Sequence, residues 1–270
     1  MPEGHTLHRL ALDLTGTFGG KSVRSSSPQG RFEAAAGLDG RDLVEATAHG
    51  KHLFVAFADT EQQVHVHLGL YGSFAFVEDP EPPVVGQVRW RLASDRVTAD
   101  LRGPTACELL TPGEVEAVLA RLGEDPLDPD ADVERAAALV ARSRAPIATL
   151  LMDQRVIAGV GNVYRAEVLF RHRLDPKTPG RDLRPSTFLT IWSDLVDLMG
   201  EGVRTGRIDT VRPEHEPEAM GRPPREDDHG GEVYVYRRDG RPCHVCGTKV
   251  RTEVLAARNL FWCPRCQRRR

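Results

Sequence analysis

Two pairs of cysteines near the end of the chain constrain its fold more than any other feature. Cys243 and Cys246 form one Cys-x2-Cys pair, and Cys263 and Cys266 form a second pair sixteen residues further on. Each pair places two thiolates on one tight turn, and two such turns complete a tetrahedral zinc site. Because disulfides are rare in the cytosol, zinc explains this spacing best in a cytosolic chain. Four protein ligands leave no open coordination position, so we expect one structural Zn²⁺ and no catalytic metal.

The sequence between the cysteine pairs predicts a small β-ribbon. Residues 250–255 and 260–262 have the pattern of two strands, with residues 256–259 as their connection. The region is basic, because residues 240–270 hold eight Lys or Arg and one acid. Arg258 is expected at the hairpin tip, where it could enter DNA, although a solvated turn arginine is the simpler interpretation of that position alone. We assign residues 233–270 to a zinc-finger ribbon.

The other end of the chain begins with Met1-Pro2-Glu3-Gly4. If Met1 is removed, Pro2 becomes a free secondary amine beside Glu3, which places a nucleophile next to an acid. Apolar residues at helical spacing through residues 5–15 then predict a helix with one buried face, whose dipole would disfavour the ammonium form of the amine. A proline Schiff base is a permanently charged iminium and withdraws electrons at any pH. The competing interpretation is ordinary capping, since proline is common at a helix start.

Composition indicates a soluble globular protein of more than one domain. The 270 residues are 40% hydrophobic and 28% charged, without an apolar run of membrane-spanning length. The start is acidic rather than basic, so we expect no signal peptide and no membrane partner, and we place the protein in the cytoplasm. The net charge of −3 argues only superficially against nucleic acid, because the basic C-terminal ribbon makes the distribution of charge more informative than its sum.

The first half of the chain is expected to form a β-sandwich. Short stretches with period-two alternation are separated by Gly, Pro and Asp turns, at residues 43–48, 53–58, 64–68, 73–77, 87–93 and 97–101. A short helix is expected at residues 112–122. We assign residues 1–122 to an N-terminal sandwich domain that includes the first helix.

Three places in this domain stand out. Lys51 follows a glycine at the mouth of a strand, where its ammonium could reach a phosphate, although a solvated lysine is commoner there. His67 ends a strand directly before a Gly-Leu-Tyr-Gly turn. The apolar pair in that turn, Leu70 and Tyr71, could replace a base extruded from a duplex, or could fold back on the sandwich.

The second half of the chain is predicted to be helical. Prolines and acids in residues 123–132 predict an interdomain linker. Helical periodicity follows at residues 133–143, 147–152, 163–172 and 186–199. We assign residues 133–232 to a helical domain, in which the Pro-, Gly- and acid-rich residues 209–231 predict a mobile loop. Asn162 follows two glycines and can cap the next helix, whose free N–H groups would bind an anion; a plain capped turn is an equal interpretation.

In this order, these segments resemble the bacterial formamidopyrimidine-DNA glycosylase/endonuclease VIII family, and its endonuclease VIII branch in particular. The resemblance covers nearly the whole chain and rests on six stretches: Met-Pro-Glu-Gly at 1–4, Gly-Lys at 50–51, His-Leu-Gly-Leu-Tyr-Gly at 67–72, Gly-Glu-Asp-Pro-Leu at 123–127, Gly-Val-Gly-Asn-Val-Tyr at 159–164 and the cysteine ribbon. It implies an α+β fold: an N-terminal β-sandwich domain with a catalytic N-terminal helix, a helix-two-turns-helix domain and a C-terminal zinc ribbon, with DNA between the lobes.

The resemblance also implies an activity and a role for each matching residue. The protein would be a bifunctional DNA glycosylase and abasic-site lyase of base excision repair, acting as a monomer on damaged double-stranded DNA. Pro2 would be the Schiff-base nucleophile, and Glu3 the acid that assists opening of the sugar ring. The DNA contacts implied are Lys51, His67, Asn162 and Arg258 for the backbone, with Leu70 and Tyr71 as a void-filling wedge.

Details of the motifs bear on the lesion that would be removed. The Leu70-Tyr71 wedge and the Gly4 start favour oxidised pyrimidines, excised through a Pro2 Schiff base with β,δ-elimination of the strand. His5-Thr6 stands where many relatives have an acidic pair, so a possible second carboxylate is missing. The alternatives are an 8-oxoguanine- or formamidopyrimidine-preferring glycosylase on the same scaffold, and a noncatalytic zinc-ribbon DNA-binding protein.

Overall fold

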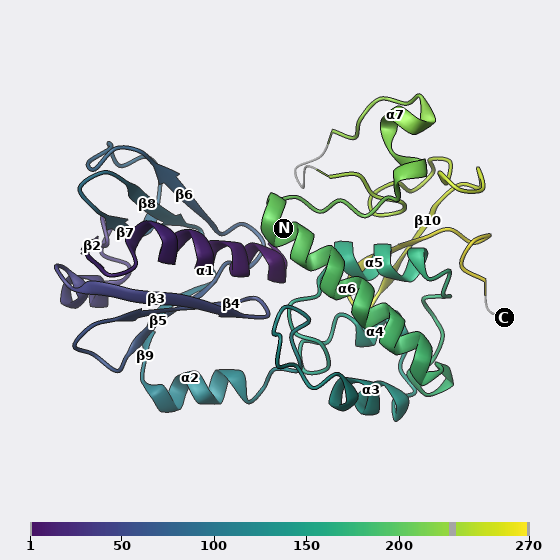
Figure 1. Cartoon of the computed structure of the whole chain (residues 1–270), viewed down its shortest axis with the longest axis horizontal. Coiled ribbons are helices and arrows are strands. Elements are labelled where there is room, and N and C mark those ends of the chain that lie inside the picture. Colours follow the sequence, from purple (N-terminus) through teal and green to yellow (C-terminus); the bar gives the residue numbers. More distant parts are fainter. Residues whose placement is uncertain (1, 227–230, 269–270) are drawn as a thin grey trace. The chain divides into compact units, whose positions relative to one another are not determined.

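The chain folds as two compact units. The computed structural model describes residues 2–226 and 231–268, with unit 1 formed by residues 1–121 and unit 2 by residues 122–270 (Figure 1). The predicted removal of Met1 therefore concerns a residue outside the described ones. No helix in the described part of the chain combines the length and the apolar character needed to cross a membrane.

Unit 1 consists of one long helix, α1, and two antiparallel sheets that enclose a common apolar core. The five-stranded sheet has the order β1-β3-β4-β5-β9, and the four-stranded sheet has the order β2-β7-β8-β6. The elements of unit 1 are α1 (Gly4–Phe18), β1 (Lys21–Ser22), β2 (Arg24–Ser26), the 3-10 helix η1 (Glu33–Leu38), β3 (Asp42–His49), β4 (His52–Phe57), β5 (Gln63–His67), β6 (Ser73–Val77), β7 (Val88–Ala93), β8 (Thr98–Arg102), β9 (Ala106–Leu110) and α2 (Pro112–Leu119).

Helix α1 runs antiparallel to β3 and is anchored by its apolar face. Its buried side chains include Leu7, Leu10 and Leu14, which form the apolar face that the helical spacing through residues 5–15 predicts. The Ala46 N–H donates to Thr15 Oγ1 at 2.8 Å, and the Gly20 N–H donates to the Leu43 carbonyl at 2.8 Å. Because the C-terminal end of α1 lies beside the beginning of β3, the start of α1 lies toward the β3–β4 turn. Figure 1 shows both at one end of unit 1.

The sequence predicts six of the nine strands of unit 1, and the other three have identifiable reasons for escaping the pattern. Strands β1 and β2 contain two and three residues, too few for an alternation to be visible. Strand β9 has no alternating burial, because Ala106, Cys107 and Leu109 are all partly exposed.

Unit 2 is helical up to the zinc ribbon, and its core includes the zinc ligands Cys243 and Cys263. Helix α5 crosses this core with every residue from Asn162 to Phe170 buried. The elements of unit 2 are α3 (Val133–Ala141), α4 (Ile147–Leu150), α5 (Asn162–Arg171), η2 (Gly180–Asp182), α6 (Pro185–Thr205), η3 (Pro213–His215), α7 (Pro217–Met220), β10 (Arg251–Leu255) and β11 (Arg258–Trp262).

The segment expected to be a linker, residues 123–132, is packed into unit 2 instead. The Gly123 N–H donates to the Gln154 carbonyl at 2.8 Å, and the Glu124 carbonyl accepts from Ala158 at 2.9 Å. Asp125 is fully buried, and its Oδ1 accepts from the Leu127 N–H at 2.9 Å. The acids that suggested a solvated linker therefore bind backbone N–H groups within turns.

The expected mobile loop, residues 209–231, contains two short helices in its described part. These are η3 and α7, each begun by a proline at its first turn. Thr210 at its start is fully buried and donates through Oγ1 to Glu167 at 2.7 Å. Residues 227–230 lie outside the described residues, and the mobility of the loop stays a prediction.

Candidate functional site

The predicted nucleophile lies directly before α1. Glu3 is the N-cap residue of the helix, with extended backbone, and its carbonyl accepts from the Thr6 N–H at 2.9 Å. The Glu3 side chain is fully buried, whereas Pro2 is half-buried. The anchored helix thus fixes the position of an acid beside the first residues of the chain.

Lys51 occupies the tip of the β3–β4 hairpin. His49 and His52 form the closing pair, so Gly50 and Lys51 make a two-residue turn. Gly50 has φ 58° and Lys51 is not among the residues with positive φ, which matches a type II′ turn with glycine at its first central position. The Lys51 side chain is half-buried at the end of unit 1 toward which α1 begins.

A row of histidines lies behind this turn on one face of the five-stranded sheet. His65 Nδ1 is 3.0 Å from Glu108 Oε1, and His52 Nδ1 is 2.8 Å from His65 Nε2. The geometry is satisfied when His65 donates to the carboxylate and His52 donates to His65. Burial lowers the pKa of His52 to about 3, with further lowering from His67, His65, His49 and Arg121. The Glu108 carboxylate therefore orients a chain of two imidazoles, His65 and then His52, and this chain ends next to Lys51.

His67 stands beside this chain and is oriented by the next loop. Its ring centroid is 5.0 Å from that of His52, and the Gly69 N–H donates to His67 Nδ1 at 3.2 Å. Nδ1 is therefore the acceptor, and in the neutral ring Nε2 carries the proton. Burial lowers the pKa of His67, and the nearby His65 and Lys51 lower it further. His67 is thus a neutral hydrogen-bond donor in the physiological pH range.

The apolar pair expected to act as a wedge projects into solvent. Leu70 is 47% exposed and Tyr71 is 87% exposed, so neither side chain folds back on the sandwich. The loop beneath them is tight, because the Gly72 N–H donates to the Leu68 carbonyl at 3.0 Å. Gly69 has φ 67°, and a Cβ there would overlap the side chain of Thr105. Two exposed apolar side chains are therefore carried on a closely packed base.

In unit 2, Asn162 is the first residue of α5 and not its cap. Gly161 is the N-cap residue, so the predicted capping role of Asn162 is wrong. The Asn162 side chain is 5% exposed; its Nδ2 donates to the Asn259 carbonyl at 3.0 Å, and its Oδ1 accepts from Arg165. Arg165 is itself buried and donates to the same Asn259 carbonyl at 2.9 Å. These contacts fasten the start of α5 to strand β11.

Arg258 is exposed and lies next to this fastened position. It is the first residue of β11 and pairs with Leu255 across a two-residue turn formed by Ala256 and Ala257. The predicted four-residue connection at residues 256–259 is therefore wrong, and Arg258 lies directly after the turn. Both alanines have positive φ, at 48° and 59°, which a type I′ turn requires and which glycine usually supplies. The turn is consequently one that the sequence pattern did not reveal.

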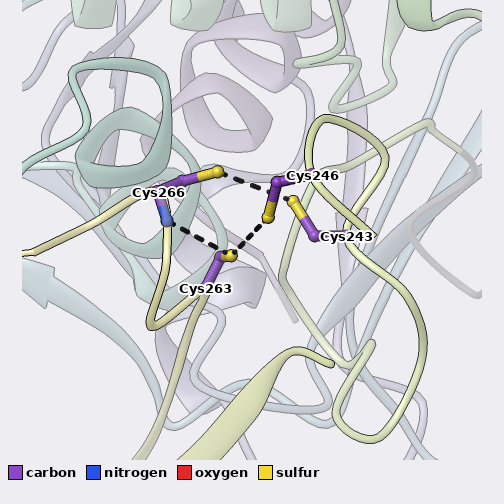
Figure 2. A group of neighbouring side chains, drawn as sticks. All are labelled: Cys243, Cys246, Cys263 and Cys266. Carbon is purple, nitrogen blue, oxygen red and sulfur yellow. Dashed lines mark hydrogen bonds between the residues drawn. The ribbon is translucent and has the colours of Figure 1, made fainter. Parts of the chain in front are cut away.

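The four cysteines come together with their sulfur atoms converging (Figure 2). The ligand atoms lie within 4.8 Å of one another, with Cys243 Sγ 3.9 Å from Cys266 Sγ and Cys246 Sγ 3.5 Å from Cys263 Sγ. A tetrahedral zinc site with Zn–S bonds of about 2.3 Å requires sulfur separations of about 3.8 Å. The geometry fits one structural zinc ion.

Comparison with protein families finds three matches along the chain. The formamidopyrimidine-DNA glycosylase N-terminal domain matches residues 1–107, its H2TH domain matches residues 122–213, and the zinc finger found in FPG and IleRS matches residues 240–269. Endonuclease 8 1 of Mycobacterium tuberculosis is 52% identical, covering 99% of this chain and 100% of that protein. The chain belongs to the formamidopyrimidine-DNA glycosylase/endonuclease VIII family.

Other relatives include both branches of the family. A formamidopyrimidine-DNA glycosylase of Parasynechococcus marenigrum is 29% identical, covering 99% of each chain, and a probable endonuclease 8 2 of Streptomyces coelicolor is 31% identical, covering 99% of this chain and 94% of that protein. The crystal structure of MutM (Fpg) from Thermus thermophilus matches with a TM-score of 0.76 at 26% identity, covering 98% of each chain. The protein is a DNA glycosylase of base excision repair with one structural zinc.

The structure divides the predicted residues between the two units. Pro2, Glu3, Lys51, His67, Leu70 and Tyr71 belong to unit 1, and Asn162, Arg258 and the four cysteines belong to unit 2. Sequence reasoning missed His52, His65 and Arg165. The first two carried a signal, since His-x-His at 65–67 pairs with His52 across the sheet. Arg165 follows Asn162 at helical i, i+3 spacing, but nothing in the pattern marks it as buried.

Proposed function

We propose that this glycosylase is bifunctional and uses Pro2 as a Schiff-base nucleophile. The observation that carries the proposal is the fully buried Glu3 carboxylate at the N-cap of α1, immediately after Pro2. A secondary amine at the chain start, placed beside an acid by an anchored helix, is suited to attack a sugar carbon while the ring oxygen receives a proton.

The reaction then follows from the chemistry of the amine. The Pro2 nitrogen attacks C1′ of a nucleotide extruded from the duplex, and the damaged base leaves. With Glu3 assisting ring opening, the product is an iminium that joins Pro2 to C1′. The iminium withdraws electrons and acidifies the C2′ proton, so the 3′ phosphate is eliminated. A second elimination at the 5′ side removes the sugar and leaves a one-nucleotide gap.

The DNA contacts are proposed on the position and exposure of each side chain. Lys51 at a hairpin tip and exposed Arg258 next to the α5–β11 junction supply positive charge for phosphates. His67 adds a neutral donor through Nε2. Exposed Leu70 and Tyr71 fill the space of the extruded base. Asn162 remains a proposed phosphate contact, with the Asn259 carbonyl as a second partner of its amide.

Oxidised pyrimidines are the proposed substrates. The support is the 52% identity to endonuclease 8 1, against 29% to the formamidopyrimidine-DNA glycosylase of Parasynechococcus marenigrum. The second candidate, a preference for 8-oxoguanine or formamidopyrimidine lesions, draws on the latter relative. Duplexes with thymine glycol, 5-hydroxyuracil, 8-oxoguanine or an abasic site, compared for kcat/KM, distinguish the two. A higher value for 8-oxoguanine than for both pyrimidines would reverse the assignment.

Borohydride reduction tests the nucleophile. Incubation with a duplex that contains an abasic site should give a covalent protein–DNA adduct, and Pro2→Gly should lose most of it because a primary amine replaces the secondary one. Intact mass must first establish that Met1 is absent, since a retained Met1 blocks the amine. An unchanged adduct yield in Pro2→Gly would exclude Pro2, and the absence of any adduct with the processed parent would favour the noncatalytic DNA-binding alternative.

A further inference from the structure

Arg238 is a buried cation beside the first pair of zinc-binding cysteines, and the Glu167 carboxylate interacts with it electrostatically without a hydrogen bond between the two side chains. The Arg238 side chain is 7% exposed and forms no ion pair among the described residues, whereas neighbouring Arg222 pairs with Glu232 at 2.7 Å. A buried charge without compensation is costly, so such an arginine calls for a source of negative charge nearby.

The guanidinium of Arg238 is held against the first zinc turn. Its Nη2 donates to the Pro242 carbonyl at 2.8 Å and lies 3.4 Å from His244 Nδ1, and its Nη1 donates to the Tyr234 carbonyl. Pro242 and His244 are the residues on either side of the zinc ligand Cys243. The cation therefore contacts the main chain that presents this ligand.

A zinc site with four cysteines supplies negative charge beside Arg238, in addition to that of Glu167. Four thiolates outnumber the two positive charges of Zn²⁺, so the occupied site is an anion. We propose that Arg238 is a positioning residue of the zinc site, which offsets the thiolate charge and holds the Cys243 turn in the geometry that binds zinc. Groups that support metal ligands in this way affect metal affinity nearly as much as the ligands do.

The same arginine connects the zinc turn to helix α5. Glu167, in the middle of α5, accepts the N–H groups of Tyr234 at 2.6 Å, Val235 at 2.8 Å and Tyr236 at 2.8 Å. Tyr234 thus binds Glu167 through its N–H and Arg238 through its carbonyl. An unbroken series of main-chain and side-chain contacts runs from Cys243 to the helix that begins at Asn162.

Zinc retention tests this role. We expect Arg238→Met, which keeps the length of the side chain and removes its charge, to release zinc to a chromogenic chelator about 10- to 100-fold faster than the parent. Arg238→Lys should restore part of the retention, because it returns the charge without the second hydrogen bond. Arg241→Met is the matched control: Arg241 is exposed, three residues along the same turn, and its loss should leave the release rate unchanged.

A spectroscopic measurement separates this role from general support of the fold. In Co²⁺-substituted protein, Arg238→Met should shift the thiolate-to-metal charge-transfer band, whereas Arg241→Met should not. Saturating zinc should restore DNA affinity in Arg238→Met. A zinc release rate equal to that of the parent, or an unshifted charge-transfer band, would overturn the proposal. If Arg238→Met does not fold, Arg238→Lys and Arg238→Gln are compared in its place. Equal zinc retention in those two variants would then overturn the proposal. The readouts are independent of the Pro2 chemistry.

Discussion

Helices α1 and α5 hold their units together in opposite ways. Helix α1 buries Leu7, Leu10 and Leu14 and carries the candidate reactive residues ahead of its first turn. Helix α5 is buried along nearly its whole length and includes Asn162, Arg165 and Glu167 among its buried side chains. Helix α1 thus presents the candidate chemistry of unit 1 from an apolar support, whereas helix α5 anchors unit 2 through buried polar contacts in addition to its apolar ones.

This difference predicts different responses to damage. Apolar packing weakens in proportion to the area and volume that are lost, so a substitution in α1 should have a graded effect. Buried hydrogen bonds and metal ligands act collectively, because each group left without its partner keeps its full desolvation cost. Unit 2 should therefore fail more abruptly than unit 1.

Removal of zinc should have the largest effect and should be confined to unit 2. The four ligands belong to unit 2, and binding of structural zinc is worth about 10–16 kcal/mol in zinc-finger peptides. We expect chelation to reduce affinity for duplex DNA by about two orders of magnitude, while hydrogen exchange in β3, β4 and β5 is unchanged. Unchanged DNA affinity after verified metal loss would contradict this prediction. An increase in hydrogen exchange that is equal in both units would show that the effect of zinc is not confined to unit 2.

Glu167→Gln should destabilise unit 2 by about 3–5 kcal/mol, because the amide cannot accept all the bonds that the carboxylate accepts from the backbone and from Thr210. Thermal unfolding with probes in each unit measures this. Thr210→Val, which removes one of these bonds, should cost about 1 kcal/mol. Glu201→Gln is the exposed control on α6 and should leave the melting temperature unchanged. Equal effects of Glu167→Gln and Thr210→Val would argue against a collective network.

Acid should weaken unit 1 through the half-buried histidine His52. Its folded pKa of about 3 lies below the ordinary 6.5, so the unfolded chain binds more protons as the pH falls through 6.5. The contribution of the neutral His52 ring to the free energy of unfolding is therefore fully present above pH 6.5 and is lost as the pH falls toward 3. The expected loss between pH 7 and pH 5 is about 2 kcal/mol. Denaturant unfolding of the parent and of His52→Gln at both pH values tests this. An equal loss in the two proteins would remove His52 as the cause.

Loss of one phosphate contact should produce the smallest change. Lys51→Ala and Arg258→Ala should each reduce the slope of log K against log salt by about 0.9, since each removes one charged contact with duplex DNA. The two reductions should add in the double variant. Lys21→Ala, an exposed lysine at the opposite end of β3, is the control and should leave the slope unchanged. A full slope in either single variant would remove that residue from the contacts.

Sequence patterns predicted the parts of the molecule in which local chemistry decides structure. The apolar face of α1 emerged from helical spacing, and the zinc site from two cysteine pairs. The fold class and the zinc ion are confirmed. In both cases residues close in sequence carry the information, because one helical turn or one tight turn already sets the geometry.

Contacts between distant residues were not predictable in this way. Arg165 and Asn259 are 94 positions apart, and their hydrogen bond depends on how β11 meets α5. The Ala256-Ala257 turn was missed because alanine is unusual at positive φ, which costs about 1–2 kcal/mol per residue. The Glu108–His65–His52 chain needs three strands in register before it exists. Such features appear only once tertiary structure is fixed.

The loop that carries Tyr71 offers a practical opportunity. Its ring is almost wholly in water, while the glycines on either side are locked against Thr105 and Leu68. Because the loop is rigid, a spectroscopic probe at this position responds to changes in its local environment and little to motion of the loop itself. An indole introduced at this position would test the proposed wedge, because its insertion into damaged DNA would change the fluorescence and could be timed separately from bond cleavage.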